Sequence, residues 1–184
     1  MPTIFMQKIM SGGQTGVDRA ALDVALALGL PCGGWCPQGR LAEDGPIDPR
    51  YPLRETPSAD YAQRTEWNVR DSDGTLILAR GRPTGGTAQT IVCAQQLKQP
   101  HLVVDLTRPA DPAAARAWIA RERLRVLNVA GPRESKSPGV YRDAVQFLQR
   151  LLGSRRSATR ASRRSVDAPR GSAGSHSSSM VVRI

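Results

Sequence analysis

Two kinds of hydrophobic pattern alternate along the 184-residue chain. Short runs of consecutive apolar residues predict strands, and segments with apolar residues every three or four positions predict helices. We expect strands at residues 8–10, 30–35, 53–55, 75–79, 101–106 and 126–129, with residues 4–6 leading into the first. We expect helices at residues 17–28, 59–70, 87–97, 112–123 and 139–152.

This alternation predicts an α/β fold, namely a Rossmann-like three-layer domain over residues 1–153 with a mainly parallel sheet and helices on both faces. The runs at 75–79 and 101–106 are largely apolar, which is typical of strands buried on both faces of such a sheet. Residues 36–52 are polar and rich in proline and glycine, so we expect an irregular segment there. A long loop beside a ligand often acts as a lid.

Three loops that contain glycine follow predicted strands: residues 11–16 (the first loop), 80–86 (the second loop) and 130–139 (the third loop). In an open parallel sheet, ligands bind outside the carboxyl ends of the strands, at the point where the strand order reverses. The sequence therefore predicts that these three loops lie at a binding site.

The first loop, SGGQTG, leads directly into a predicted helix. Its glycines allow a sharp turn and a close approach to a ligand, and the N–H groups and dipole of a helix N-terminus favour a phosphate. Asp18 would repel a phosphate placed too close, so we expect it to bind a ribose-like or pterin-like group or to pair with Arg19. A tight turn with an ordinary helix cap is the alternative interpretation. The candidate binding residues are Gly12, Gly13, Gln14, Thr15, Gly16, Asp18 and Arg19.

The second and third loops offer similar chemistry. Glycines again free the backbone ahead of a helix in the second loop, and threonine hydroxyls stand beside them. The third loop combines cationic and hydroxyl side chains, a set suited to an anion, although an ordinary solvated loop can have the same composition. The candidate binding residues are Thr84, Gly85, Gly86 and Thr87 around the end of the second loop, and Arg133, Ser135 and Lys136 in the third.

Charge is concentrated at the C-terminal end of the chain. The formal net charge is +10, of which residues 154–184 carry +6 through seven arginines and one aspartate. This segment also holds nine serines and little to bury, so we expect it to be disordered. It is either an arm that binds nucleic acid or a dispensable tail.

Three cysteines, an odd and small number, indicate free thiols in a reducing compartment. Cys32 and Cys36 have no matching second pair, so no zinc site is expected. No apolar run is long enough to cross a membrane, and no signal peptide precedes the first loop. We therefore expect a cytoplasmic protein.

Motifs throughout residues 9–152 resemble the putative molybdenum carrier family, a circularly permuted YpsA-type branch of the SLOG superfamily. They are SGGQTGVDRAALDVALALG, WCPQGRLAEDGPI, YPLRET, YAQRTEWNVRDSDGTLIL, TGGTAQT and LNVAGPRESKSPGVY. The resemblance implies a Rossmann-like sheet whose glycine loops bind a nucleotide or a pterin such as molybdenum cofactor, which a carrier binds without changing it.

The same superfamily contains LOG-type hydrolases, which cut the N-glycosidic bond of nucleoside monophosphates with an arginine and a P-G-G-x-G-T-x-x-E motif. Laid on this chain, Arg64 stands where that arginine would be, and Thr84, Gly85 and Gly86 match the start of the motif with threonine in place of proline. Val92 occupies the position of the glutamate, whose carboxylate would stabilise the cation-like transition state. This substitution weakens the hydrolase hypothesis unless Asp18, Glu66 or Asp71 replaces the glutamate.

Three hypotheses follow. The favoured one is a binding or carrier protein for a small anionic ligand, either molybdenum cofactor or a nucleotide. The second is an enzyme that acts on nucleoside monophosphates, with Arg64 as the candidate catalytic residue. The third is association with nucleic acid through residues 154–184. Pairing of two copies through helices is compatible with each.

Overall fold

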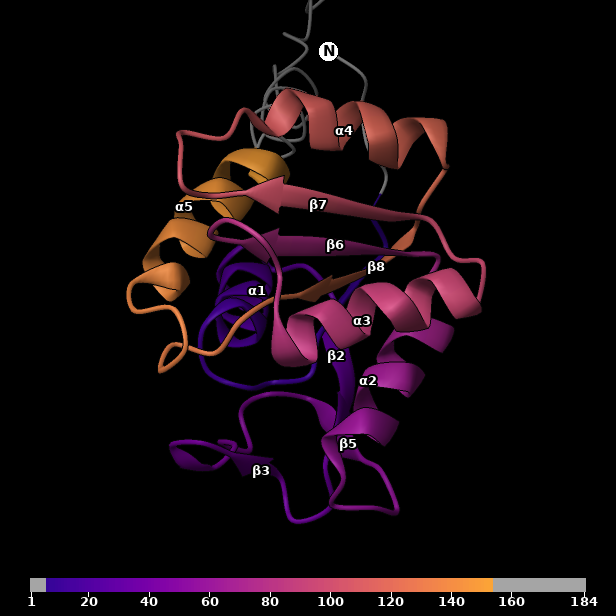
Figure 1. Ribbon diagram of the computed structural model, residues 1–184, viewed down its shortest axis with the longest axis vertical. Helices are drawn as coiled ribbons and strands as arrows, with labels where there is room; N and C mark the ends of the chain where they lie inside the picture. The colour runs from indigo at the N-terminus through magenta and orange to yellow at the C-terminus, as the bar shows by residue number, and fades with distance from the viewer. Residues whose placement is uncertain (1–5, 154–184) are drawn as a thin grey trace, which may run out of the picture. The chain divides into compact units, whose positions relative to one another are not determined.

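A six-stranded sheet organises the domain, as the computed structural model shows for the residues that it describes, 6–153. Its order is β5-β2-β1-β8-β6-β7, and every neighbouring pair is parallel (Figure 1). The strands are β1 (Lys8–Met10), β2 (Cys32–Cys36), β5 (Leu53–Glu55), β6 (Gly74–Ala79), β7 (His101–Asp105) and β8 (Val126–Ala130).

Helices cover both faces of this sheet, which confirms the predicted three-layer α/β fold. On one face α1 (Val17–Ala27) packs on α5 (Val140–Leu152), and α5 packs on α4 (Pro112–Arg121). On the other face α2 (Tyr61–Arg70) packs on α3 (Gly85–Gln96). The main hydrophobic core joins the first group to the sheet, because α1 and α5 direct apolar side chains such as Val24 and Phe147 against Leu76 and Leu127.

The two strands predicted to be buried on both faces differ. All six residues of β6 are buried, as expected for a strand with a neighbour on each side. The strand predicted at residues 101–106 is present as β7, but the prediction that it is buried is wrong, because β7 lies at the edge of the sheet and Val103 is 40% exposed. A largely apolar run therefore does not by itself distinguish a central strand from an edge strand.

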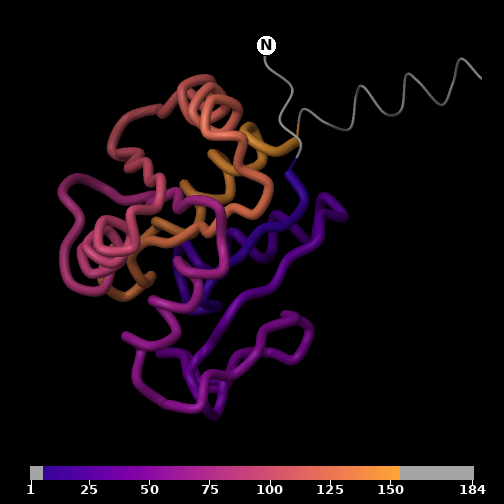
Figure 2. The backbone as a smooth tube through the Cα atoms, turned by 90° about the vertical axis from the view of Figure 1, so that its right-hand side faces the viewer, coloured from indigo at the N-terminus to yellow at the C-terminus, as the bar shows by residue number. Residues whose placement is uncertain are grey.

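The segment between β2 and β5 is more ordered than predicted. It contains a hairpin, β3 (Leu41–Ala42) and β4 (Gly45–Pro46), and projects at one end of the domain (Figures 1 and 2). A second, smaller core beneath it consists of Leu22, Cys36, Ile47, Tyr51 and Leu53. The prediction of an irregular segment missed this hairpin because its strands are only two residues long.

Two helix starts differ from the sequence prediction. The α2 helix begins at Tyr61, where the Asp60 side chain accepts a hydrogen bond from the Ala62 amide at 2.9 Å. The α3 helix begins at Gly85, so both glycines of TGG belong to its first turn. Within residues 6–153, none of the helices has the length and hydrophobicity to cross a membrane. The predictions for residues 4–5 and for the tail, 154–184, lie outside the described residues.

Candidate functional site

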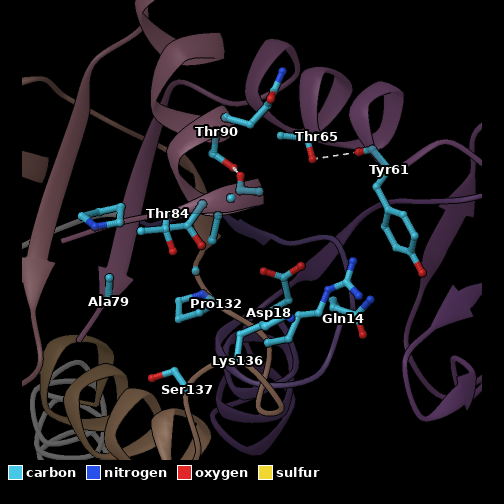
Figure 3. Close-up of a pocket in the computed structure, with 18 of the residues that line it drawn as sticks. Gln14, Asp18, Tyr61, Thr65, Ala79, Thr84, Thr90, Pro132, Lys136 and Ser137 are labelled. Atoms are coloured by element: carbon cyan, nitrogen blue, oxygen red, sulfur yellow. Dashed lines mark hydrogen bonds between the residues drawn. The ribbon is translucent and has the colours of Figure 1, made fainter. Parts of the chain in front are cut away.

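A cleft of about 710 Å³ lies where the loops after β1, β6 and β8 meet the first half of α2 (Figure 3). The chain passes from β1 to β2 and β5 on one side, then crosses to β6 and β7 on the other and returns to β8 between them. The strand order thus reverses beside β1, which is the position at which parallel α/β sheets bind ligands. Nine of the predicted residues line the cleft: Gln14, Asp18, Arg64, Thr84, Gly85, Gly86, Thr87, Arg133 and Lys136.

Six other predicted residues are absent from the lining of the cleft: Gly12, Gly13, Thr15, Gly16, Arg19 and Ser135. The glycines among them allow close packing. At Gly16, whose φ is +74°, a Cβ atom would lie 2.3 Å from the Pro132 carbonyl oxygen, and at Gly12 it would lie 1.7 Å from Arg64 Nη1. The first loop is therefore packed tightly against the third loop and against Arg64.

The N-terminus of α1 already has acceptors from the protein. The Val17 amide donates to the Pro132 carbonyl at 3.3 Å. Asp18 adds a carboxylate in the first turn of the helix, where negative charge is favourable. A phosphate at this helix end would meet both groups, so the arrangement does not favour the phosphate site expected there.

Asp18 forms an ion pair with Arg64, with 2.9 Å between Oδ2 and Nη1. The side chains are only 4% and 15% exposed. Burial raises the pKa of Asp18, while the charge and hydrogen bond of Arg64 and a hydrogen bond from the Gln14 backbone oppose the rise. The expected pairing with Arg19 is wrong, because Arg19 instead binds Asp44 at 3.1 Å and the Gly13 carbonyl.

Two buried donors beside this pair have no acceptor among the described residues: Gln14 Nε2 and Arg64 Nε. The other end of the Gln14 amide, Oε1, accepts from the backbone amides of Thr15 at 3.0 Å and Glu43 at 2.9 Å. A buried donor without an acceptor costs roughly 1–3 kcal/mol. A ligand or water that supplied acceptors at this floor of the cleft would remove that cost.

The N-terminus of α3 is open, in contrast to that of α1. Its cap residue, Thr84, makes no side-chain capping bond. The amides of Gly85 and Gly86 have no acceptor within residues 6–153, and a Cβ atom at either glycine would meet nothing within 4 Å. These two N–H groups and the dipole of α3 are available to an anion in the cleft.

Three cations line the same part of the cleft: Arg82, Arg133 and Lys136. None of them is within ion-pair distance of a carboxylate in the described part of the chain, whereas Arg80 pairs with Asp143. Arg82 was missed by the sequence analysis although it belongs to the second loop. Tyr61 was missed as well, and its ring lies 4.9 Å from the Arg133 guanidinium.

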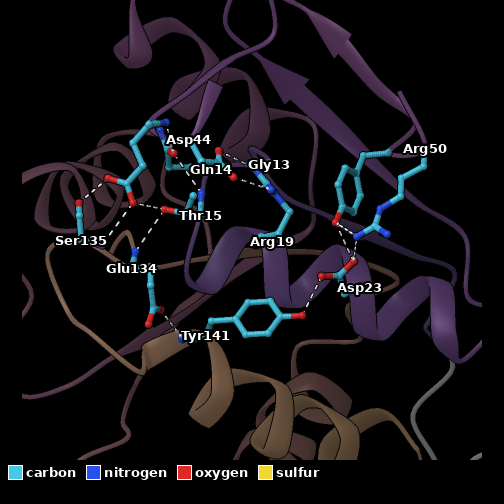
Figure 4. A network of polar contacts seen from close by, with 12 residues as sticks. Gly13, Gln14, Thr15, Arg19, Asp23, Asp44, Arg50, Glu134, Ser135 and Tyr141 are labelled. Atoms are coloured by element: carbon cyan, nitrogen blue, oxygen red, sulfur yellow. Dashed lines mark hydrogen bonds and ion pairs between the residues drawn. The ribbon is translucent and has the colours of Figure 1, made fainter. Parts of the chain in front are cut away.

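Thr15 and Ser135 connect the loops to the hairpin. Both hydroxyls donate to the carboxylate of Glu43 in the turn between β3 and β4, and the Ser135 amide donates to it at 3.2 Å (Figure 4). The slight burial of Glu43 would raise its pKa, but these hydrogen bonds outweigh that effect and lower it. Thr15 and Ser135 thus hold the hairpin against the first and third loops, and they do not line the cleft.

No group of three or more His, Cys, Asp or Glu residues in the described part of the chain could hold a metal ion. The three cysteines, all within that part, are free thiols.

Comparison with known proteins places the chain in a family. Residues 9–152 match the model of the circularly permutated YpsA SLOG family. The chain is 47% identical to the protein in a crystal structure named putative molybdenum carrier protein from Syntrophus aciditrophicus SB, over 82% of this chain and 98% of that one, with a TM-score of 0.79. A search of curated proteins gave no match. The sequence and the fold agree, and the chain belongs to the circularly permutated YpsA SLOG family.

Proposed function

We propose that the protein binds a phosphate-bearing small ligand in the cleft and carries it without chemical change, the ligand being molybdenum cofactor or a nucleotide. One observation carries the proposal: the open N-terminus of α3 lies in the same cleft as three cations that form no ion pair with a carboxylate of residues 6–153. The ligand's phosphate binds the amides of Gly85 and Gly86, with Thr84 and Thr87 beside them and with Arg82, Arg133 and Lys136 supplying positive charge.

The similarity to a protein named as a molybdenum carrier supports molybdenum cofactor as one cargo. In that cofactor the sulfur atoms of the pterin itself hold the metal. Such a cargo suits a chain whose described residues offer no cluster of metal ligands. The protein then needs to recognise only the pterin and its phosphate.

Calorimetric titration of the purified protein with molybdenum cofactor, nucleoside 5′-monophosphates and the matching nucleosides tests the proposal. We expect the monophosphates to bind at least about tenfold more tightly than the nucleosides, a difference of about 1.4 kcal/mol. Combined Arg82→Ala and Lys136→Ala substitutions should reduce this difference, because only Arg133 and the start of α3 then remain to bind the phosphate. Arg125→Ala, which removes an exposed cation just before β8 at the opposite end of that strand, is the matched control. No binding of either ligand class at millimolar concentration would refute the proposal.

A second candidate function is cleavage of the N-glycosidic bond of a nucleoside monophosphate. Its supporting observation is the contact between Arg64 and Asp18 in the cleft, which gives the candidate catalytic arginine a nearby carboxylate. Val92, at the position of the glutamate in the hydrolase motif, is 46% exposed and is absent from the cleft lining. Release of free base from a panel of monophosphates would establish this activity, and its absence would leave the carrier function.

The free thiols of Cys32, Cys36 and Cys93 are the basis for a proposed cytoplasmic location. Fractionation of the source cells with an antibody against the protein tests it. The nucleic-acid hypothesis rests on residues 154–184 and remains a prediction from composition, which loss of salt-dependent DNA binding on removal of those residues would support.

A further inference from the structure

Three groups of the cleft have no assigned role in binding the phosphate: the carboxylate of Asp18, the donor Gln14 Nε2, which has no acceptor among residues 6–153, and the ring of Tyr61, beside which Arg133 lies. All three line the cleft (Figure 3). They come from the first loop and from the starts of α1 and α2, whereas the anion-binding groups come from the second and third loops. One ligand with a phosphate and a planar ring can therefore contact both sets.

Asp18 is an acceptor with capacity to spare. Its Oδ2 atom accepts from Arg64 at 2.9 Å, the Gln14 backbone also donates to the carboxylate, and no other side chain of residues 6–153 does. A carboxylate has about four lone-pair positions. Asp18 lines the cleft, and 4% of its side chain is exposed. Two adjacent N–H groups of a ligand can donate to this carboxylate together.

Gln14 is a donor with a fixed orientation. Its Oε1 atom accepts from the backbone amides of Thr15 and Glu43, so the hydrogen-bond network directs Nε2 away from them. Gln14 is only 3% exposed, and Nε2 has no acceptor among residues 6–153. Nε2 carries two N–H groups, and the carbonyl oxygen of a ligand would accept a hydrogen bond from one of them.

Asp18 can accept from two N–H groups, and Gln14 can donate to a carbonyl. Together they match the 2-amino-4-oxopyrimidine edge that guanine and pterins share. The ring N–H and the amino group of that edge donate to Asp18, and its carbonyl oxygen accepts from Gln14. Adenine presents an amino group where this edge has a carbonyl, and a ring nitrogen without hydrogen where it has the N–H. It would leave Gln14 unpaired and direct a lone pair at the carboxylate.

We propose that the cleft selects ligands with a 2-amino-4-oxopyrimidine edge through Asp18 and Gln14, with the ring packed against Tyr61. This inference rests on the proposed function, since it assigns the ring end of the same phosphate-bearing ligand. The cleft, at about 710 Å³, is within the range of about 300–1,000 Å³ that small-molecule sites occupy. Guanosine monophosphate and a pterin monophosphate are two sources of this one edge.

Calorimetry with four monophosphates tests the selectivity. Guanosine and neopterin monophosphates carry the complete edge, inosine monophosphate lacks the 2-amino group, and adenosine monophosphate has the opposite pattern. We expect the guanosine and neopterin monophosphates to bind at least about tenfold more tightly than adenosine monophosphate. The affinity of inosine monophosphate should lie between these two levels. The tighter of the first two identifies which source of the edge the cleft prefers.

The substitution Gln14→Glu isolates the donor. It retains an oxygen that accepts from Thr15 and Glu43, and it replaces only the donor Nε2 by an acceptor. The variant should lose most of the preference for guanosine over adenosine and should gain affinity for 2,6-diaminopurine riboside monophosphate, whose amino group replaces the carbonyl. Thermal unfolding, measured alongside, confirms that the variant is folded.

The outcomes separate the two proposals. If none of these monophosphates binds, the proposed function fails and the selectivity fails with it. If all of them bind with similar affinity, the phosphate site stands and the edge selectivity is wrong. If the guanosine preference is present but survives in folded Gln14→Glu protein, the assignment to Gln14 is wrong.

Discussion

The first and second loops have similar sequences, with paired glycines near the start of a helix, but the surroundings of those glycines differ. In the first loop the glycines make room for Arg64 and for the Pro132 carbonyl, and Asp18 occupies the first turn of α1. In the second loop the space around Gly85 and Gly86 is open, and the start of α3 has no acidic residue. The glycines of the first loop therefore face packed protein atoms, and those of the second loop face open space.

Removal of the carboxylate of the first loop should have the largest effect. Asp18→Ala leaves Arg64 buried without its partner, so we expect a loss of about 3–5 kcal/mol in the free energy of unfolding. Asp44→Ala breaks a more exposed ion pair, that with Arg19, and should cost less than about 1 kcal/mol. Urea denaturation measures both, and equal stability of the two variants would contradict a structural role for Asp18.

A methyl group added to each loop tests the comparison directly. Gly16→Ala places Cβ against the Pro132 carbonyl at a positive φ and should cost at least about 2 kcal/mol. Gly86→Ala adds a methyl group in open space within a helix and should stabilise the protein by up to about 1 kcal/mol. Thermal unfolding of the two variants measures both effects. Comparable destabilisation of both would mean that protein atoms also pack against the glycines of the second loop.

The second loop can be made to resemble the first. Gly86→Asp puts a carboxylate at the second residue of α3, the position that Asp18 has in α1. We expect binding of nucleoside monophosphates to weaken at least about tenfold, or about 1.4 kcal/mol, while the helix dipole keeps the fold stable. Gly86→Asn has nearly the same size without the charge, and an equal loss of affinity in both variants would exclude an electrostatic cause.

The smallest effect concerns the hairpin that joins the first and third loops through Glu43. Because hydrogen bonds lower the pKa of Glu43 below its ordinary value of 4.5, the ionised form stabilises the hairpin above that pH, and the stabilisation is lost as the pH falls through the folded-state pKa. Hydrogen exchange of residues 39–47 should accelerate between about pH 6 and pH 3 relative to Glu43→Gln, after correction for intrinsic rates. Identical pH profiles would show that Glu43 does not hold the hairpin.

Sequence patterns predicted the order of the main elements and the place of the cleft, because both follow from the alternation of strands and helices. They did not distinguish the two glycine loops, since a glycine that faces Arg64 and one that faces open space have the same local sequence. The contact between Asp18 and Arg64 joins residues 46 positions apart and depends on how α1 and α2 are placed. The edge position of β7 was missed for the same reason, because strand order is a property of the whole sheet.

The central claim is that the anionic group of the ligand binds at the start of α3 and not at the start of α1. A ¹H–¹⁵N NMR titration with a nucleoside monophosphate observes the glycine amides of both loops in one experiment. The account predicts large, saturable shifts for Gly85 and Gly86 and small ones for Gly12, Gly13 and Gly16. Shifts concentrated in the first loop, with Gly85 and Gly86 unchanged, would contradict it.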